Sequence, residues 1–437
     1  MKRFMNSLKT INYRLFFAIL VLMIFPAIYQ TVRIHFLGAM PDDSGFNIAS
    51  QLSWVNLFYE VIQEALILPL FFVLGKSLGN NDEFENKVKT GLLLTGTIYT
   101  AVSLILIIFT KPLVIFMAQE IKLIDATVNY IRLETIAALA ATLFQFMRAV
   151  LITLKKDIYM YITLIIQMLL SILLDTFLIS ELSFSLKVGI NGIAFANIIV
   201  NLVNLLICSF LLRKESIYIF NKKKLSFAWV KEWLYVGKYS GIESSVRNFA
   251  FMIMVIRMVN LVSEQGNYWV ANNFIWQWLL LPTLALSDLI KKEIGEDKNN
   301  IQTKTLGYIT ISIIFSTLYL MSIPLWKPFL HYIMNIESFE TVYTIALIQT
   351  VFYISFIFNT MIDSIFYGIG RTDYMLIQSL IVNIVFMGGM FVLYLMGIFV
   401  PTLLSISLLF GFGMFFDFIP TILLYFKILK DMHFHIL

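Results

Sequence analysis

The chain has 437 residues, of which 59% are hydrophobic and 14% are charged, and its mean hydropathy is +0.84. This composition excludes an ordinary water-soluble protein. The single cysteine, Cys208, excludes a disulfide framework and a cysteine-based metal site within one chain.

A run of about 20 apolar residues is long enough to cross the hydrocarbon core of a bilayer. In chain order, such segments lie at roughly 12–38, 47–75, 89–110, 127–152, 158–180, 189–212, 233–262, 268–290, 305–325, 341–369, 374–397 and 400–426. The short alternating segments of a β-barrel are missing, so we predict an all-α integral membrane protein with twelve transmembrane helices. The first apolar run is too long for a cleaved signal peptide and is predicted to be helix 1.

The net charge of +5 is explained by topology, and it does not indicate a nucleic-acid partner. With a cytoplasmic N-terminus, only four basic residues fall in outside loops, namely Lys111, Lys122, Lys187 and Lys327. Six more lie within helices: Arg33, Arg132, Arg148, Lys238, Arg247 and Arg257. All others fall in inside loops and tails. This asymmetry predicts a multi-pass protein of the cell's inner membrane with both termini in the cytoplasm.

The sequence divides into two six-helix halves. The polar stretch 213–233 is predicted to be a cytoplasmic basic and amphipathic linker between lobes at 1–212 and 234–437, with Trp229 and Trp233 in the headgroup zone. Arg33 and Arg257 fall near the outer end of the first helix of each half. Because each half has an even number of helices, we expect a parallel pseudo-two-fold repeat about an axis along the membrane normal.

Several local strings then suggest a family. They are SILLDTFLI (171–179), GINGIAFANIIVNLVNLL (189–206), LSFAWVKEWLYVG (225–237), VANNFIWQWLLLPTLALS (270–287) and GIGRTDYM (368–375). Because these strings occur together and in this order, the chain resembles a divergent member of the multidrug and toxic compound extrusion (MATE) family. The resemblance implies two lobes around a central cleft and export of a substrate in exchange for H⁺ or Na⁺. It also implies an acid on helix 1 or helix 7, where this sequence has Arg33 and Arg247.

Helix 2 carries a pair of carboxylates at mid-depth. Glu60 and Glu64 are four residues apart and share one helix face, with Gln63 close to it. Carboxylates that close repel, so one of them is expected to hold a proton at neutral pH. We therefore predict an ion or substrate site here, the alternative being that the pair neutralises arginines.

The helix 7 charges form a second candidate set. Arg247 lies near the centre of its helix and Glu243 one turn before it, so either the two pair with each other or Arg247 binds an anionic group. Arg33 and Arg257 either join a site or extend toward the headgroups. Arg148 and Asp363 occupy equivalent positions of the two halves and are gate or inter-lobe candidates.

These features predict a secondary active exporter that works by alternating access, is not an enzyme, and needs no cofactor besides a coupling ion. A phosphate-binding loop is missing, so ATP is not the energy source within this chain. The expected partners are a small-molecule substrate and the lipid bilayer, and the protein is expected to be monomeric. One alternative is a flippase or exporter of an anionic or lipid-linked substrate. A remote alternative is a membrane glycosyltransferase that uses Asp42 or Asp43.

Overall fold

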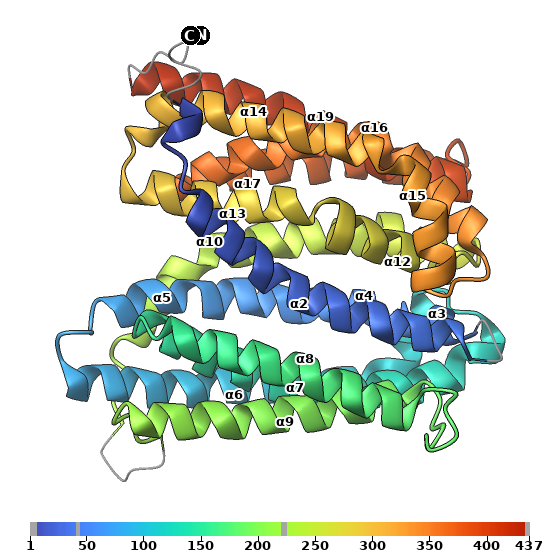
Figure 1. The fold of residues 1–437 in the computed structure, drawn as a ribbon, viewed down its shortest axis with the longest axis horizontal. Coiled ribbons are helices and arrows are strands. Elements are labelled where there is room, and N and C mark those ends of the chain that lie inside the picture. Colours follow the sequence, from blue (N-terminus) through green and yellow to red (C-terminus); the bar gives the residue numbers. More distant parts are fainter. Residues whose placement is uncertain (1–6, 41–43, 220–224, 433–437) are drawn as a thin grey trace. The chain divides into compact units, whose positions relative to one another are not determined.

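The computed structural model describes residues 7–40, 44–219 and 225–432, and over these ranges it contains helices and no strand (Figure 1). Ten helical segments within them are long and apolar enough to cross a membrane. The predicted all-α membrane fold is therefore confirmed, whereas the count of twelve spans and their arrangement in lobes stay predictions.

The described residues between 13 and 214 form eight α-helices and two short helical segments. They are α2 (Tyr13–Gly38), α3 (Ser44–Ala49), α4 (Leu52–Ile62), the π-helix η1 (Gln63–Ile67), α5 (Leu68–Gly75), α6 (Asn81–Phe116), the 3-10 turn η2 (Ile121–Leu123), α7 (Ile124–Thr153), α8 (Asp157–Leu178) and α9 (Asn191–Lys214). Thus α4, η1 and α5 continue one another without a break in the chain.

The second part has more interruptions. Its helices are α10 (Val230–Phe251), η3 (Met252–Ile256), α11 (Arg257–Leu261), α12 (Gln265–Phe274), η4 (Ile275–Leu279), α13 (Leu281–Glu296), α14 (Asn300–Met321), α15 (Ile323–Pro328), η5 (Phe329–Ile333), α16 (Phe339–Gly368), α17 (Thr372–Leu380), η6 (Ile381–Met387), α18 (Gly388–Leu395) and α19 (Leu403–Asp431). The segments predicted at 233–262 and 268–290 are helical but are not among the ten. The first of them carries several charged residues, and Leu280 interrupts the second just before Pro282.

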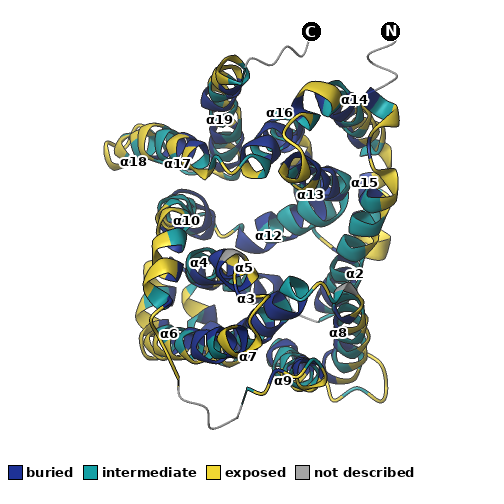
Figure 2. Cartoon of the chain, turned by 90° about the vertical axis from the view of Figure 1, so that its left-hand side faces the viewer, coloured by how far each residue is buried: buried dark blue, intermediate teal, exposed yellow. Residues whose placement is uncertain are grey.

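The exposed side of most of α9 is apolar, as expected for a helix that contacts lipid. Along α9 as far as Phe210, exposed side chains recur at helical spacing and are apolar, for example Phe195, Leu206 and Phe210, while the opposite side is buried (Figure 2). Leu206 is 70% exposed, which is unfavourable in water and favourable against acyl chains. The apolar residues that raise the mean hydropathy of the chain therefore include those on the exposed side of α9.

The structure divides into two compact units. One unit is Tyr29–Met252, and the other holds the described residues up to Ile28 together with Ile253 onward. The predicted lobes at 1–212 and 234–437 follow the sequence repeat and stay a prediction.

Within the second of these units, the chain before α2 is held by a buried acid. Glu293 of α13 is 2% exposed and accepts a hydrogen bond from the backbone N–H of Asn12 at 2.9 Å. Its carboxylate also pairs with Lys304 at 3.0 Å and accepts a hydrogen bond from Tyr308. Ile11 and Phe16 pack in the same apolar cluster as α13 and α16. Polar and apolar contacts together thus fix the start of the chain.

The tryptophans of the linker do not lie at an exposed interface, so that expectation was wrong. Trp229 is 9% exposed and Trp233 is 0% exposed, and their rings stack with centroids 4.9 Å apart. The indole N–H of Trp229 donates to Thr90 Oγ1 at 2.9 Å, and that of Trp233 donates to the carbonyl oxygen of Leu66 at 2.8 Å. Because both donors find partners inside the protein, neither ring needs the headgroup zone.

Candidate functional site

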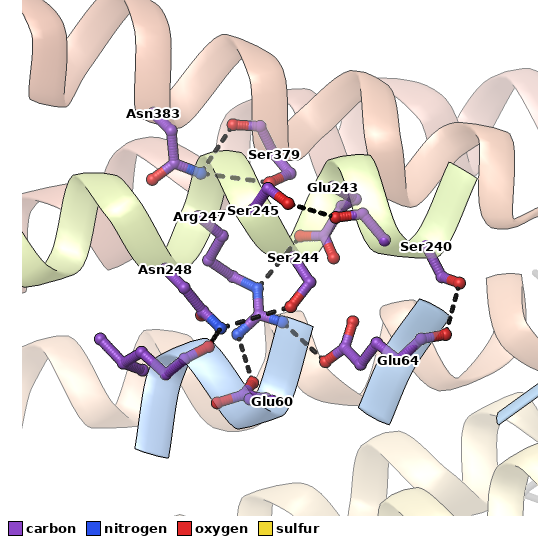
Figure 3. A network of polar contacts seen from close by, with 12 residues as sticks. Glu60, Glu64, Ser240, Glu243, Ser244, Ser245, Arg247, Asn248, Ser379 and Asn383 are labelled. Carbon is purple, nitrogen blue, oxygen red and sulfur yellow. Dashed lines mark hydrogen bonds and ion pairs between the residues drawn. The ribbon is translucent and has the colours of Figure 1, made fainter. Parts of the chain in front are cut away.

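The polar site in the unit Tyr29–Met252 is centred on Arg247 of α10 (Figure 3). Its Nε donates to Glu243 Oε1 at 3.1 Å, its Nη1 to Glu60 Oε1 at 3.1 Å and its Nη2 to Glu64 Oε1 at 2.8 Å. The carboxylates come from α10 itself, from α4 and from η1. One guanidinium therefore holds three carboxylates, and we call these four residues the Arg247 cluster.

Local helix geometry explains why these side chains meet. Glu243 and Arg247 are separated by four residues on α10, and Glu60 and Glu64 have the same separation across α4 and η1, so each pair shares a face. Asn248 donates to Ser244 Oγ and to the carbonyl oxygen of Leu57, both at 3.3 Å, and so fastens α10 to α4 beside the cluster.

The cluster is partly shielded and unbalanced in charge. The side chains of Glu64 and Glu243 are 19% and 12% exposed, while those of Arg247 and Glu60 are 40% and 38% exposed. When all four groups are ionised, the carboxylates outnumber the guanidinium by three to one. An excess of negative charge in a shielded site favours uptake of a proton or another cation.

Of the candidate residues on helices 2 and 7, the three glutamates contact Arg247. Glu243 pairs with Arg247, and Glu60 with Glu64 also neutralises that arginine. The side chain of Gln63, the first residue of η1, makes no hydrogen bond to the cluster among the described residues. The three nitrogens of the Arg247 guanidinium each face a carboxylate in this arrangement, and the binding of an anionic group by Arg247 stays a prediction.

A second buried ion pair lies on α2 and α8. Arg33 donates from Nε to Asp175 Oδ2 at 2.8 Å and from Nη2 to Oδ1 at 3.2 Å, and the two side chains are 9% and 1% exposed. Glu134 of α7 is also buried and accepts two hydrogen bonds from Asn197, at 2.8 and 3.1 Å. Arg33 therefore does not extend toward the headgroups. The sequence carries no local signal for the pair, since Arg33 and Asp175 are 142 positions apart.

The remaining candidates lie elsewhere. Arg148 on α7 places its guanidinium 5.6 Å from the ring centroid of Phe144. In the other unit, Asp363 on α16 accepts a hydrogen bond from Gln378 at 2.9 Å, and Arg257 is the first residue of α11. The inter-lobe pairing of Arg148 and Asp363 stays a prediction.

The enzyme and metal alternatives concern other residues. Asp42 and Asp43, named for a glycosyltransferase, lie outside the described residues. Over the ranges that the structure covers, no group of three or more His, Cys, Asp or Glu side chains is arranged to hold a metal ion.

Comparison with known proteins points to one family. Residues 65–177, which include Glu134 and Asp175, match the family model MatE. This segment of the chain is similar to the MATE family. Members of that family are transporters and not enzymes.

Solved structures support the same fold over nearly the whole chain. An inward-facing multidrug resistance MATE transporter matches with a TM-score of 0.76 and 16% identity, over 91% of this chain and 92% of the other. A MATE transporter mutant from Vibrio cholerae matches with a TM-score of 0.69 and 15% identity over 99% of both chains. No curated protein matches the sequence. At these identities, the structural likeness concerns the fold alone.

A third structure bears on polarity. It is a MOP superfamily transporter from Pyrococcus furiosus, for which a reverse polarity of the binding pocket is said to suggest a different function. It matches with a TM-score of 0.68 and 17% identity, over 97% of this chain and 96% of the other.

Proposed function

We propose that this protein is a MATE-type secondary active exporter that moves a small organic substrate out of the cytoplasm in exchange for H⁺ or Na⁺, with the Arg247 cluster as its coupling site. Similar structures include both inward-facing and outward-facing transporters, which supports alternating access. The proposal includes a monomer in the cell's inner membrane, with both termini cytoplasmic and no cofactor besides the coupling ion.

The observation that carries the proposal is the ratio of three carboxylates to one guanidinium. Charges at membrane depth are costly unless they are compensated. A proton, a sodium ion or a cationic group of a substrate can each compensate the excess carboxylates. Because these cations compete for the same oxygens, binding of one favours release of another. Such competition at a single site is the thermodynamic basis of antiport.

The alternative is a flippase or exporter of an anionic or lipid-linked substrate. The Pyrococcus furiosus relative supports it, because the polarity of that protein's pocket is described as reversed. The contacts in this chain favour the first proposal, since Arg33 pairs with Asp175 and Arg247 with three glutamates. An anion at either arginine would have to displace a carboxylate.

The test is transport in proteoliposomes under an imposed pH or Na⁺ gradient, with ethidium as a cationic probe and carboxyfluorescein as an anionic one. The variant is the double substitution Glu60→Gln and Glu64→Gln, which keeps the size of both side chains and removes both charges. The matched control is Glu181→Gln, because Glu181 pairs with Lys187 at an exposed position outside the cluster.

We expect the wild type and the Glu181 control to couple ethidium movement to the gradient. In the double variant, the rate of gradient-coupled ethidium transport should fall at least tenfold, and the melting temperature should stay the same. Undiminished coupled transport by the double variant would refute the assignment of the cluster. Coupled transport of carboxyfluorescein without ethidium would favour the anionic alternative.

A further inference from the structure

The π-helix η1 places Glu64 in an irregular stretch of backbone. The N–H of Leu68 donates to the carbonyl oxygen of Gln63, five residues earlier, which is the π pattern. The next residue is Pro69, which has no N–H to offer the carbonyl oxygen of Glu64. The chain therefore needs a donor from outside this helix at the residue that carries the carboxylate.

One face of α10 supplies that donor and a second one. Ser240 Oγ donates to the carbonyl oxygen of Glu64 at 2.8 Å, and the indole of Trp233 donates to that of Leu66 at 2.8 Å. Between these two bonds lies Gly237, where an added Cβ would stand 1.8 Å from the carbonyl oxygen of Ala65. Three consecutive carbonyls of η1 thus rest on residues of α10 that share one helical face.

The same helix also holds the side chain of Glu64. Ser240 fixes the backbone at Glu64, and Arg247, two turns further along α10, binds its carboxylate at 2.8 Å. Each residue of an α-helix is rotated by about 100° from its neighbour, so a change of register at η1 would turn the carboxylate away from the guanidinium. Backbone and side chain are therefore aligned by a single neighbouring element.

We propose that Ser240 is a positioning residue for the Glu64 carboxylate, and that Trp233 supports it by holding the adjacent carbonyl oxygen of Leu66. The consequence of this positioning for transport rests on the function proposed above, whereas the effect of Ser240 on the geometry of Glu64 does not. The charged groups that face Glu64 are Arg247 of α10, which binds its carboxylate, and Glu243 of α10 and Glu60 of α4, which bind the same guanidinium.

The support for Trp233 extends to α6. Trp233 stacks on Trp229, which bonds to Thr90, and Asn86 exchanges hydrogen bonds with the backbone of Ser226 at 2.8 and 2.9 Å. The chain just before α10 is thus fastened at several points, which keeps the indole of Trp233 under Leu66.

The test compares Ser240→Ala with Ser245→Ala. Ser245 lies on the same helix and donates to the carbonyl oxygen of Gly241 at 2.7 Å, so its removal costs a similar bond without touching η1. Ser240→Thr keeps the hydroxyl and serves as the rescue variant. The readout is the infrared carboxyl band that disappears in Glu64→Gln, followed as a function of pH in the purified protein.

We expect Ser240→Ala to move the midpoint of this titration by on the order of one pH unit toward higher pH, because the carboxylate loses part of its contact with Arg247. Ser245→Ala and Ser240→Thr should titrate like the wild type. Trp233→Phe, which keeps an aromatic side chain and removes the N–H donor, should shift the midpoint in the same direction as Ser240→Ala. It also provides the test if Ser240→Ala does not fold.

An unchanged midpoint in both Ser240→Ala and Trp233→Phe would overturn the proposal, as would an equal shift in Ser245→Ala. The infrared titration requires no transport. If it shifts as expected while Glu64→Gln leaves coupled transport intact, the proposed function fails and the positioning role stands.

Discussion

Replacing Arg33 by methionine tests whether the buried ion pair stabilises the fold. The substitution removes two hydrogen bonds, of 2.8 and 3.2 Å, and leaves Asp175 with a side chain that is only 1% exposed. Removing one partner of a buried pair costs about 3–5 kcal/mol, because the other charge remains buried without compensation. We therefore expect Arg33→Met to lower the free energy of unfolding by about that amount.

The double variant Arg33→Met with Asp175→Leu distinguishes two causes of destabilisation, namely a buried Asp175 charge without its partner and the loss of side-chain packing. Apolar groups of similar volume can replace a buried pair at little cost. The double variant should therefore be more stable than either single variant. A residual loss is expected, since Arg33 also acts electrostatically on buried Glu134.

The assay is equilibrium unfolding in a denaturing detergent, followed by tryptophan fluorescence. Arg132→Met is the matched control, since Arg132 is exposed on α7 and donates only to the carbonyl oxygen of Ile107, at 3.3 Å. It should change stability by less than about 1 kcal/mol. The reasoning is refuted if Arg33→Met is as stable as this control, or if the double variant is no more stable than the singles.

Two further predictions concern packing and the start of the chain. Gly237→Ala should destabilise the protein by about 3 kcal/mol or more in the same assay, because its Cβ would meet a backbone oxygen at 1.8 Å. The control Gly75→Ala, whose Cβ meets nothing within 4 Å, should leave the stability unchanged. Equal stability of the two variants would contradict this packing. Glu293→Ala should speed trypsin cleavage at Lys9 and Arg14, because it releases the chain before α2. The control Glu296→Ala, at an exposed position of the same helix, should be cleaved at the wild-type rate. Cleavage of Glu293→Ala at the wild-type rate would show that the apolar contacts alone hold this part of the chain.

The site was predictable in part from sequence. Charges within apolar helices are costly wherever they fall, so Arg247, Glu60 and Glu64 could be selected before any contact was known. The spacing of four residues also gave the pair of Glu243 with Arg247 as one of two alternatives, because that contact is local to one helix. The role of Ser240 gave no such signal, since a serine in a helix has many ordinary explanations.

The amino-acid sequence by itself determined that this is a helical membrane protein, where most of its spans lie, and which charges need an explanation. These properties depend on residue type and local spacing. Only the tertiary structure decided that Arg33 meets Asp175, 142 positions away, that Arg247 meets Glu64, 183 positions away, and that Trp229 and Trp233 are buried. Such partners depend on the rotation and register of one helix against another, which are set by packing across the whole unit and leave no local pattern in the chain.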